Sequence, residues 1–193
     1  IPIPGRDVMV QAWYQGGLSV FDWTDAANPV EIAYFDRGPV DSTRLESGGY
    51  WSTYWYNGHI YGSEMARGLD VFELTPSAFI SPNEIEAARS VHLDYFNVQG
   101  QVKFAWPATF ALSRAYLDQL ERSKGLESAE IAAAREALAG AEKASDSERR
   151  TALAQLASRL ESSAGSAGDG AKVRMLAESV SKLADAPRLA RAE

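Results

Sequence analysis

Two short segments of the sequence each occur twice, and the copies follow in the same order. Residues 17–22 (GLSVFD) return as 68–73 (GLDVFE), and residues 30–36 (VEIAYFD) return as 91–97 (VHLDYFN). The copies of the second segment lie further apart, so the second unit would carry an insertion between its two segments. A duplicated unit of roughly 50 residues is typical of propeller blades and solenoid arrays.

The sequence before Trp106 predicts antiparallel strands. Short runs of β-branched and aromatic residues alternate there with turn residues, among them Gly16-Gly17 and Asn57-Gly58. The expected strands are 8–14, 18–23 and 30–36 in the first unit, and 50–56, 59–65, 69–74 and 91–97 in the second. Residues 81–84 (SPNE) are a helix start signal, so the insertion is expected to be a short helix at about 82–89.

The strand 50–56 (YWSTYWY) carries aromatic residues at both odd and even positions. Tyr50, Tyr54 and Tyr56 would lie on one face, and Trp51 and Trp55 on the other. A strand that is apolar on both faces is expected between two other sheets, whereas a sandwich strand buries one face. The predicted fold class is therefore all-β: about two antiparallel four-stranded propeller blades, in an incomplete ring, over residues 1–105.

Residues 106–193 predict an α-helical C-terminal region. Apolar residues recur there every three or four positions, which indicates helices at about 107–122, 128–144 and 171–184. A capping box at 145–148 (SDSE) begins a further helix, with Leu153, Leu156 and Leu160 on one stripe. Such alanine-rich helices with narrow leucine stripes predict a small antiparallel bundle or hairpin array.

The strand-and-turn pattern of residues 9–35, with its GLSVFD strand and DAANP turn, resembles the LVIVD repeat, and residues 59–72 match the core of that repeat. LVIVD repeats build β-propellers in bacterial secreted and cell-surface proteins. The resemblance implies an extracellular, periplasmic or cell-surface location and no catalytic residues. A closed propeller has about 4–8 blades, so we expect a C-terminal piece of a longer protein whose upstream blades are its first partner.

The composition excludes several classes of function. Residues 1–105 contain 13 acidic and 6 basic side chains, and they lack the basic patch that nucleic acid binding needs. The sequence has no run of about 18 apolar residues, so no membrane span is expected. It also has no cysteine, which excludes disulfides and thiolate metal sites.

The candidate ligand site is a face of charged loops beside an aromatic rim. In a propeller blade, the turn between Glu64 and Arg67 would lie on the same face as the loop 37–49, with Tyr50 and Trp51 bordering it. The candidate residues are Arg37, Asp41, Arg44, Glu46, Glu64 and Arg67. No cofactor or metal is expected, because His59 and His92 lack a recognised ligand spacing and residues 25–29 are ordinary turn residues.

Three functions are consistent with these patterns. The first is a non-enzymatic, exported module that binds a protein or surface partner or a ligand, with the helices as a spacer or docking tail. The second is part of a propeller enzyme whose site is completed by missing blades. The third is carbohydrate binding by Trp13, Trp51 or Trp55, which requires these side chains to be exposed, whereas packed blades predict that they are buried.

Overall fold

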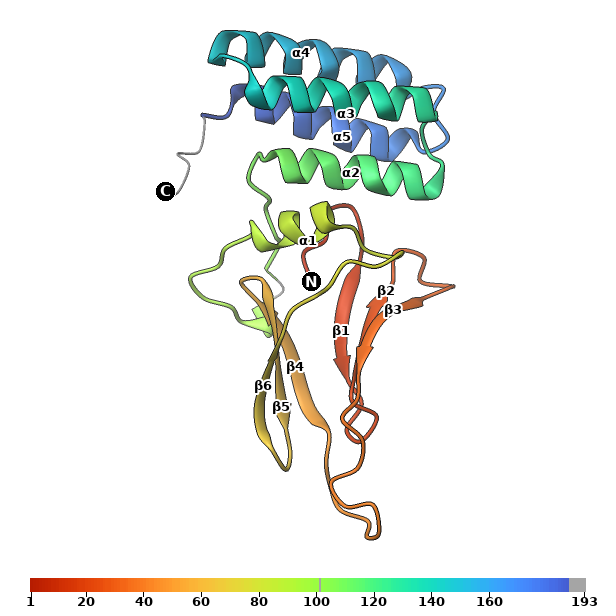
Figure 1. Ribbon diagram of the computed structural model, residues 1–193, viewed down its shortest axis with the longest axis vertical. Coiled ribbons are helices and arrows are strands. Elements are labelled where there is room, and N and C mark those ends of the chain that lie inside the picture. Colours follow the sequence, from red (N-terminus) through yellow and green to blue (C-terminus); the bar gives the residue numbers. More distant parts are fainter. Residues whose placement is uncertain (101, 188–193) are drawn as a thin grey trace. The chain divides into compact units, whose positions relative to one another are not determined.

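The computed structural model describes residues 1–100 and 102–187, and the chain divides into two compact units, Ile1–Trp106 and Pro107–Glu193. The first unit, called the β unit below, contains two antiparallel sheets and a short helix. The second, called the helical unit, contains four helices (Figure 1).

The first sheet of the β unit is a meander of β1 (Val8–Ala12), β2 (Leu18–Asp22) and β3 (Val30–Phe35), paired in the order β1-β2-β3. The turn into β2 requires glycine at Gly17, where φ is +78° and a Cβ atom would lie 2.1 Å from the Phe35 carbonyl oxygen. The turn before β3 is closed by Asp25, whose carboxylate accepts hydrogen bonds from the Ala27 backbone and the Asn28 side chain.

The second sheet is a meander of β4 (Tyr50–Tyr56), β5 (His59–Glu64) and β6 (Gly68–Phe72), in the order β4-β5-β6. Asn57 and Gly58 connect β4 to β5, both with positive φ, as a tight primed hairpin turn needs. The two sheets meet at one backbone bridge, where Tyr14 and Tyr50 exchange hydrogen bonds of 3.2 and 3.0 Å.

The predicted fold class is wrong. The chain is mixed α/β, with two separate three-stranded sheets, five α-helices and no closed sheet among the described residues. The fourth strand expected at 91–97 does not form, because Leu93 is bonded to the β4–β5 turn instead. Its N–H donates to Asn57 Oδ1 (2.9 Å), and its carbonyl accepts from Asn57 Nδ2 (3.1 Å). The outer edge of β6 therefore has no strand beside it in the part of the chain that the structure describes.

The two sequence copies also occupy different positions in their sheets. Leu18 begins the central strand β2 and is 4% exposed, whereas Leu69 lies on the edge strand β6 and is 66% exposed. The leucine of the GLxVF motif is therefore buried in one sheet and exposed in the other, and the structural equivalence that we expected of the copies is wrong.

A β-bulge changes which aromatic residues of β4 are buried. Tyr50 pairs with Glu64 but Ser52 pairs with Ser63, so Trp51 is an extra residue in the strand. The bulge places Tyr50 on the same buried face as Trp55, and it leaves Trp51 and Tyr54 exposed. The expected arrangement, with all tyrosines on one face and both faces covered, is therefore wrong.

A single hydrophobic core joins both sheets and helix α1 (Pro82–Arg89). Strand and helix residues contribute to it together: Val8, Val20, Ile32, Trp55, Ile60, Ile85 and Ala88. Helix α1 begins at a capping box of Ser81 and Glu84, as expected. Arg6 ties this helix to the first sheet, because its guanidinium lies 2.7 Å from Glu84 and 2.7 Å from Asp22.

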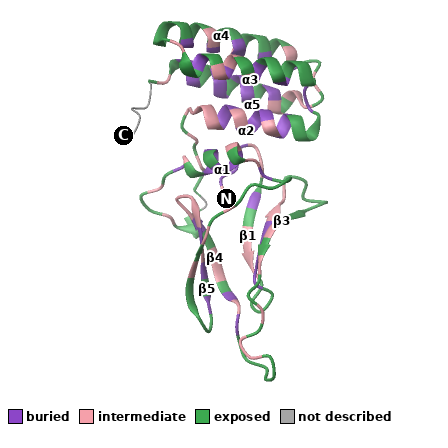
Figure 2. Ribbon diagram, viewed as in Figure 1, coloured by how far each residue is buried: buried purple, intermediate pink, exposed green. Residues whose placement is uncertain are grey.

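The helical unit is a four-helix bundle of α2 (Phe110–Ser123), α3 (Ser128–Lys143), α4 (Asp146–Ser163) and α5 (Gly170–Asp185). Neighbouring contacts run α2–α3, α3–α4, α4–α5 and α5–α2, so the helices close around one core. The predicted leucine stripe is buried, including Leu153, Leu156 and Leu160. Figure 2 shows buried positions along the helices of this unit. Within the described ranges, none of the helices has the length and hydrophobicity needed to cross a bilayer.

Candidate functional site

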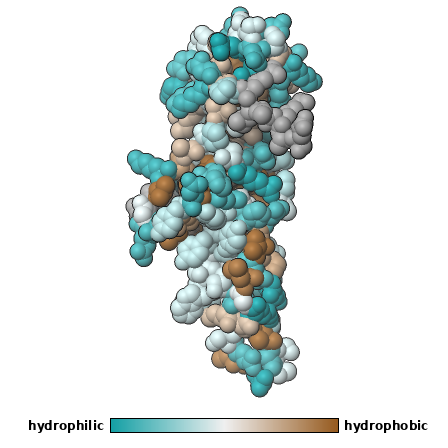
Figure 3. Space-filling view, turned by 90° about the vertical axis from the view of Figure 1, so that its left-hand side faces the viewer, coloured by the Kyte–Doolittle hydropathy of each residue, from teal (hydrophilic) through white to brown (hydrophobic). Residues whose placement is uncertain are grey.

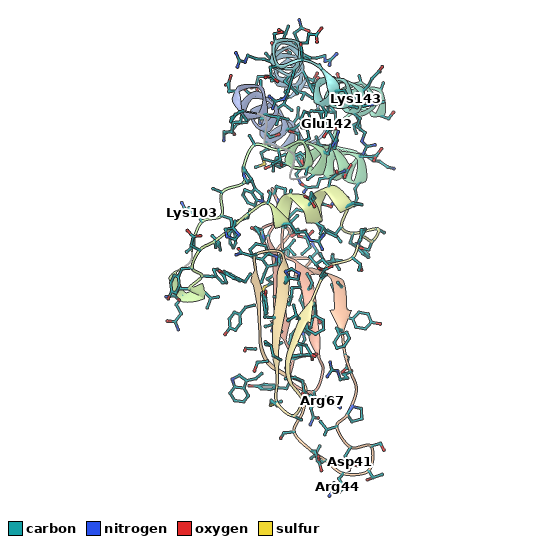
Figure 4. The ribbon with its side chains drawn as sticks, turned by 60° about the vertical axis from the view of Figure 1, so that its left-hand side comes forward. Asp41, Arg44, Arg67, Lys103, Glu142 and Lys143 are labelled. Carbon is teal, nitrogen blue, oxygen red and sulfur yellow. The ribbon has the colours of Figure 1, made fainter. Side chains whose placement is uncertain are left out.

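All six residues of the predicted loop face take part in ion pairs. Arg44 contacts Asp41 (3.1 Å) and Glu46 (2.9 Å) within the loop that joins β3 to β4. Arg67 lies at the β5–β6 turn, 3.3 Å from Glu64. Figure 4 shows Asp41, Arg44 and Arg67 at the same end of the β unit.

Glu64 is a buried structural carboxylate. It accepts backbone hydrogen bonds from Gly49 (2.8 Å), Ala66 (2.8 Å) and Arg67, so it joins the end of the β3–β4 loop to the β5–β6 turn. Burial would raise the pKa of its carboxyl, but the three backbone N–H groups and the Arg67 charge lower that pKa below its ordinary value. Glu64 is therefore ionised and fully engaged.

Arg37 is paired with Asp70, a residue that the sequence analysis did not single out. The Arg37 guanidinium lies 2.7 Å from Asp70 Oδ1, and the Tyr50 hydroxyl donates to Asp70 Oδ2 at 2.6 Å. The hydrogen bond from Tyr50 lowers the pKa of Asp70, and burial raises the pKa of Tyr50 above its ordinary value. Asp70 could have been found in the sequence as an acidic residue at an inward-facing position of a strand, between the β5–β6 turn and Phe72.

The β3–β4 loop encloses a polar cavity of about 410 Å³, lined by its own residues and Gln15. Among the described residues of its lining, Arg44 is the one basic side chain, and it pairs with both Asp41 and Glu46. No cluster of three or more metal-ligating side chains occurs in the part of the chain that the structure describes. The loop face is thus a set of closed ion pairs.

A larger hollow, of about 630 Å³, lies on the outer face of the second sheet, and it is called the tyrosine groove below. Its lining residues are Tyr54, Tyr56, Tyr61, Asp94, Tyr95, Phe96, Asn97 and Val98. Tyr54 and Tyr61 are directly opposite each other on β4 and β5. In Figure 3 the β unit presents a largely pale surface, the colour of residues of intermediate hydropathy such as tyrosine, with separate brown groups.

The second wall of the tyrosine groove is residues 94–98, and its position follows from the bonds at Leu93. The Tyr56 hydroxyl donates to the Leu93 carbonyl at 2.9 Å, beside the two bonds from Asn57. The segment is thereby held next to the tyrosines of β4. The groove was not predicted from the sequence, because residues 91–97 have the pattern of a fourth strand.

A second group of exposed aromatic side chains lies where β1 and β4 meet. Trp13, Tyr14 and Trp51 are 45%, 55% and 65% exposed, and the Tyr14 and Trp51 rings pack edge to face at 5.7 Å. The expectation that the tryptophans are buried is therefore wrong for Trp13 and Trp51, although it is confirmed for Trp55.

Comparisons with protein-family models, curated proteins and solved structures find no match to this chain. The resemblance to the LVIVD repeat stays a prediction from the sequence.

Proposed function

We propose that this protein is a non-enzymatic interaction module that binds a protein or ligand through the tyrosine groove of its β unit. The helical unit would serve as a spacer or docking element. The observation that carries the proposal is the groove itself, where four tyrosines and a phenylalanine line one hollow together with Asp94 and Asn97.

The groove has the physical character of a binding site. Ligand sites are concave, largely aromatic or apolar, and contain a few polar groups that fix orientation. Tyrosine suits such sites because its ring supplies contact area while its hydroxyl forms hydrogen bonds. Tyr95 is 77% exposed, and a partner that covered its ring would bury apolar area that water now contacts.

The loop residues support binding rather than chemistry. Arg37, Glu64 and Arg67 all stabilise neighbouring backbone or side-chain groups through short contacts. A part in a larger enzyme, the alternative function, would need at least some of these groups to be available to a substrate. The resemblance to the LVIVD repeat supports a location outside the cytoplasm.

Selection of short displayed peptides against the purified protein tests the proposal. Selected ligands are expected to bind Tyr95→Ala at least about tenfold more weakly than the unmodified protein, because that change removes a groove ring. Tyr34→Ala is the matched control, since Tyr34 lies on β3, outside the groove, and is 75% exposed. If neither substitution changes the affinity of the selected ligands, or both lower it equally, the groove is not the binding site.

Carbohydrate binding is a second candidate, favoured by the exposed group Trp13, Tyr14 and Trp51. Sugar rings stack on exposed indole faces, so quenching or a shift of tryptophan fluorescence on addition of oligosaccharides would support it. The change should disappear in Trp51→Ala and persist in Tyr95→Ala. A glycan array without any bound sugar would argue against this candidate.

A further inference from the structure

We infer that the tyrosine groove is selective for a cationic side chain, and that its occupant is an extended basic peptide segment. This inference rests on the proposed function and specifies the chemistry of the partner. Three observations carry it: the charge of the β unit, the way its basic side chains are used, and the residues of the groove.

The β unit carries a strong excess of negative charge, with 13 acidic against 6 basic side chains in residues 1–105. The arginines are engaged internally. Arg6, Arg37, Arg44, Arg67 and Arg89 each form an ion pair with a carboxylate of the same unit. The unit therefore presents surplus carboxylates to solvent, and such a field concentrates cations near the surface and increases their association rate.

One of these carboxylates lies at the groove. The side chain of Asp94 is fully exposed, and the His92 ring nitrogen lies 4.0 Å from its carboxylate. The described residues that line the groove include no lysine or arginine. A cationic group entering the groove would thus meet a carboxylate and no fixed positive charge among those residues.

The rings of the groove favour a cation over a neutral group. The Tyr56 and Tyr61 rings are 6.5 Å apart and inclined at 56°, and Tyr54 is directly opposite Tyr61 on the adjacent strand. The face of a tyrosine ring attracts an ammonium or guanidinium group through its quadrupole. Aromatic rings with a nearby carboxylate are the recurrent environment for such groups, so the groove matches an arginine or lysine side chain.

An extended segment fits this site better than a compact molecule. One wall is the exposed face of β4 and β5 and the other is the irregular segment 94–98, so the groove lies between two stretches of chain. Successive side chains of an extended peptide point in opposite directions, so alternate side chains can enter the groove while the others face solvent.

The test compares two blocked peptides, one of alternating arginine and serine and one in which citrulline replaces every arginine. Citrulline preserves the shape of arginine and removes its charge. Binding to the complete protein is followed by the NMR amide shifts of the groove residues. The arginine peptide should bind at least about tenfold more tightly, with shifts at β4, β5 and residues 94–98, and with an affinity that falls as salt is added.

Two matched variants separate the contribution of Asp94 from that of total charge. Asp94→Asn should weaken binding of the arginine peptide about threefold and leave the affinity for the citrulline peptide unchanged. Asp7→Asn removes the same charge from an exposed position outside the groove lining, and it should have no effect.

Each other outcome overturns the inference in a distinguishable way. Equal binding of both peptides, weakened by Tyr95→Ala, would exclude charge selectivity and leave the proposed binding function intact. If Asp7→Asn weakens binding of the arginine peptide as much as Asp94→Asn does, the peptide is attracted by the charge of the unit as a whole. If neither peptide binds, a basic partner is excluded. The proposed binding function would be contradicted only if the display selection also gave no ligand for the groove.

Discussion

At the scale of single residues, the charged side chains of the β unit stabilise its irregular backbone. Glu64 bonds three backbone N–H groups from two separate turns, and Asp70 receives Arg37 and Tyr50 at once. Both carboxyl groups have pKa values below their ordinary range. Each such group makes folding dependent on pH, because its ionised form is bound more favourably in the folded state.

The first prediction concerns Glu64. A lowered folded pKa means that its contribution to stability is complete above the unfolded pKa of about 4.3 and is lost as pH falls through the lower folded value. Replacing it in Glu64→Gln should destabilise the β unit by about 1–3 kcal/mol near neutral pH. Denaturant titrations of the variant should show a smaller loss of stability between about pH 5 and pH 3 than the unmodified protein shows.

Glu86→Gln is the matched control, since Glu86 is exposed on α1. An equal loss of stability in the two variants at neutral pH would contradict the structural role of Glu64.

The second prediction separates a steric clash from backbone strain at glycine. Gly17 and Gly38 have φ values of +78° and +77°, but only Gly17 would place a Cβ atom against backbone, 2.1 Å from the Phe35 carbonyl oxygen. Gly38→Ala should cost about 1 kcal/mol from the positive φ alone. Gly17→Ala should cost clearly more, about 3 kcal/mol or above, because β3 must move away from the turn. Thermal or urea unfolding measures both, and similar losses would contradict the clash.

At the scale of elements, local patterns were sufficient for most strands and helices. The leucine spacing of 153–160 indicated a buried helix face, and Asn57-Gly58 indicated a hairpin; both depend on neighbours in the chain. The segment 91–97 has the composition of a strand, but its position depends on Asn57, which is distant in sequence. The bulge at Trp51 likewise shifts the faces of β4 through its pairing with β5. Neither the tyrosine groove nor the exposed Trp51 could therefore be predicted from local pattern.

The third prediction tests this non-local contact. Asn57→Gly preserves the positive φ that the β4–β5 turn needs, and it removes both side-chain bonds to Leu93. The hairpin should remain, while the Leu93 amide should exchange its hydrogen faster by about tenfold or more. Peptides that bind the tyrosine groove should also bind more weakly, because one wall would no longer be held.

Tyr56→Phe is the graded control, since it removes the hydroxyl bonds to the Leu93 and Asp94 carbonyls and leaves both bonds from Asn57 in place. Its effect on exchange should be smaller than that of Asn57→Gly. Unchanged exchange at Leu93 in Asn57→Gly would show that other contacts hold the segment.

At the scale of the whole molecule, each unit has its own hydrophobic core. Both sheets and α1 share one core in the β unit, and the four helices close around another in the helical unit. The buried Arg149 also finds its partners within the helical unit, since it donates to the Leu183 and Ala186 carbonyls at the end of α5. The core of each unit can therefore form without residues of the other unit.

The last prediction follows from the location of the groove. Every residue that lines it belongs to the β unit, and so do Asn57 and Leu93, which hold its second wall. A chain ending after Trp106 should therefore bind groove ligands within about twofold of the complete protein, whereas the isolated helical unit should not bind them. Calorimetry with the same peptide measures both affinities, and circular dichroism establishes that each piece is folded. A folded β unit with a large loss of affinity would show that the helices take part in binding, and it would exclude their role as a spacer.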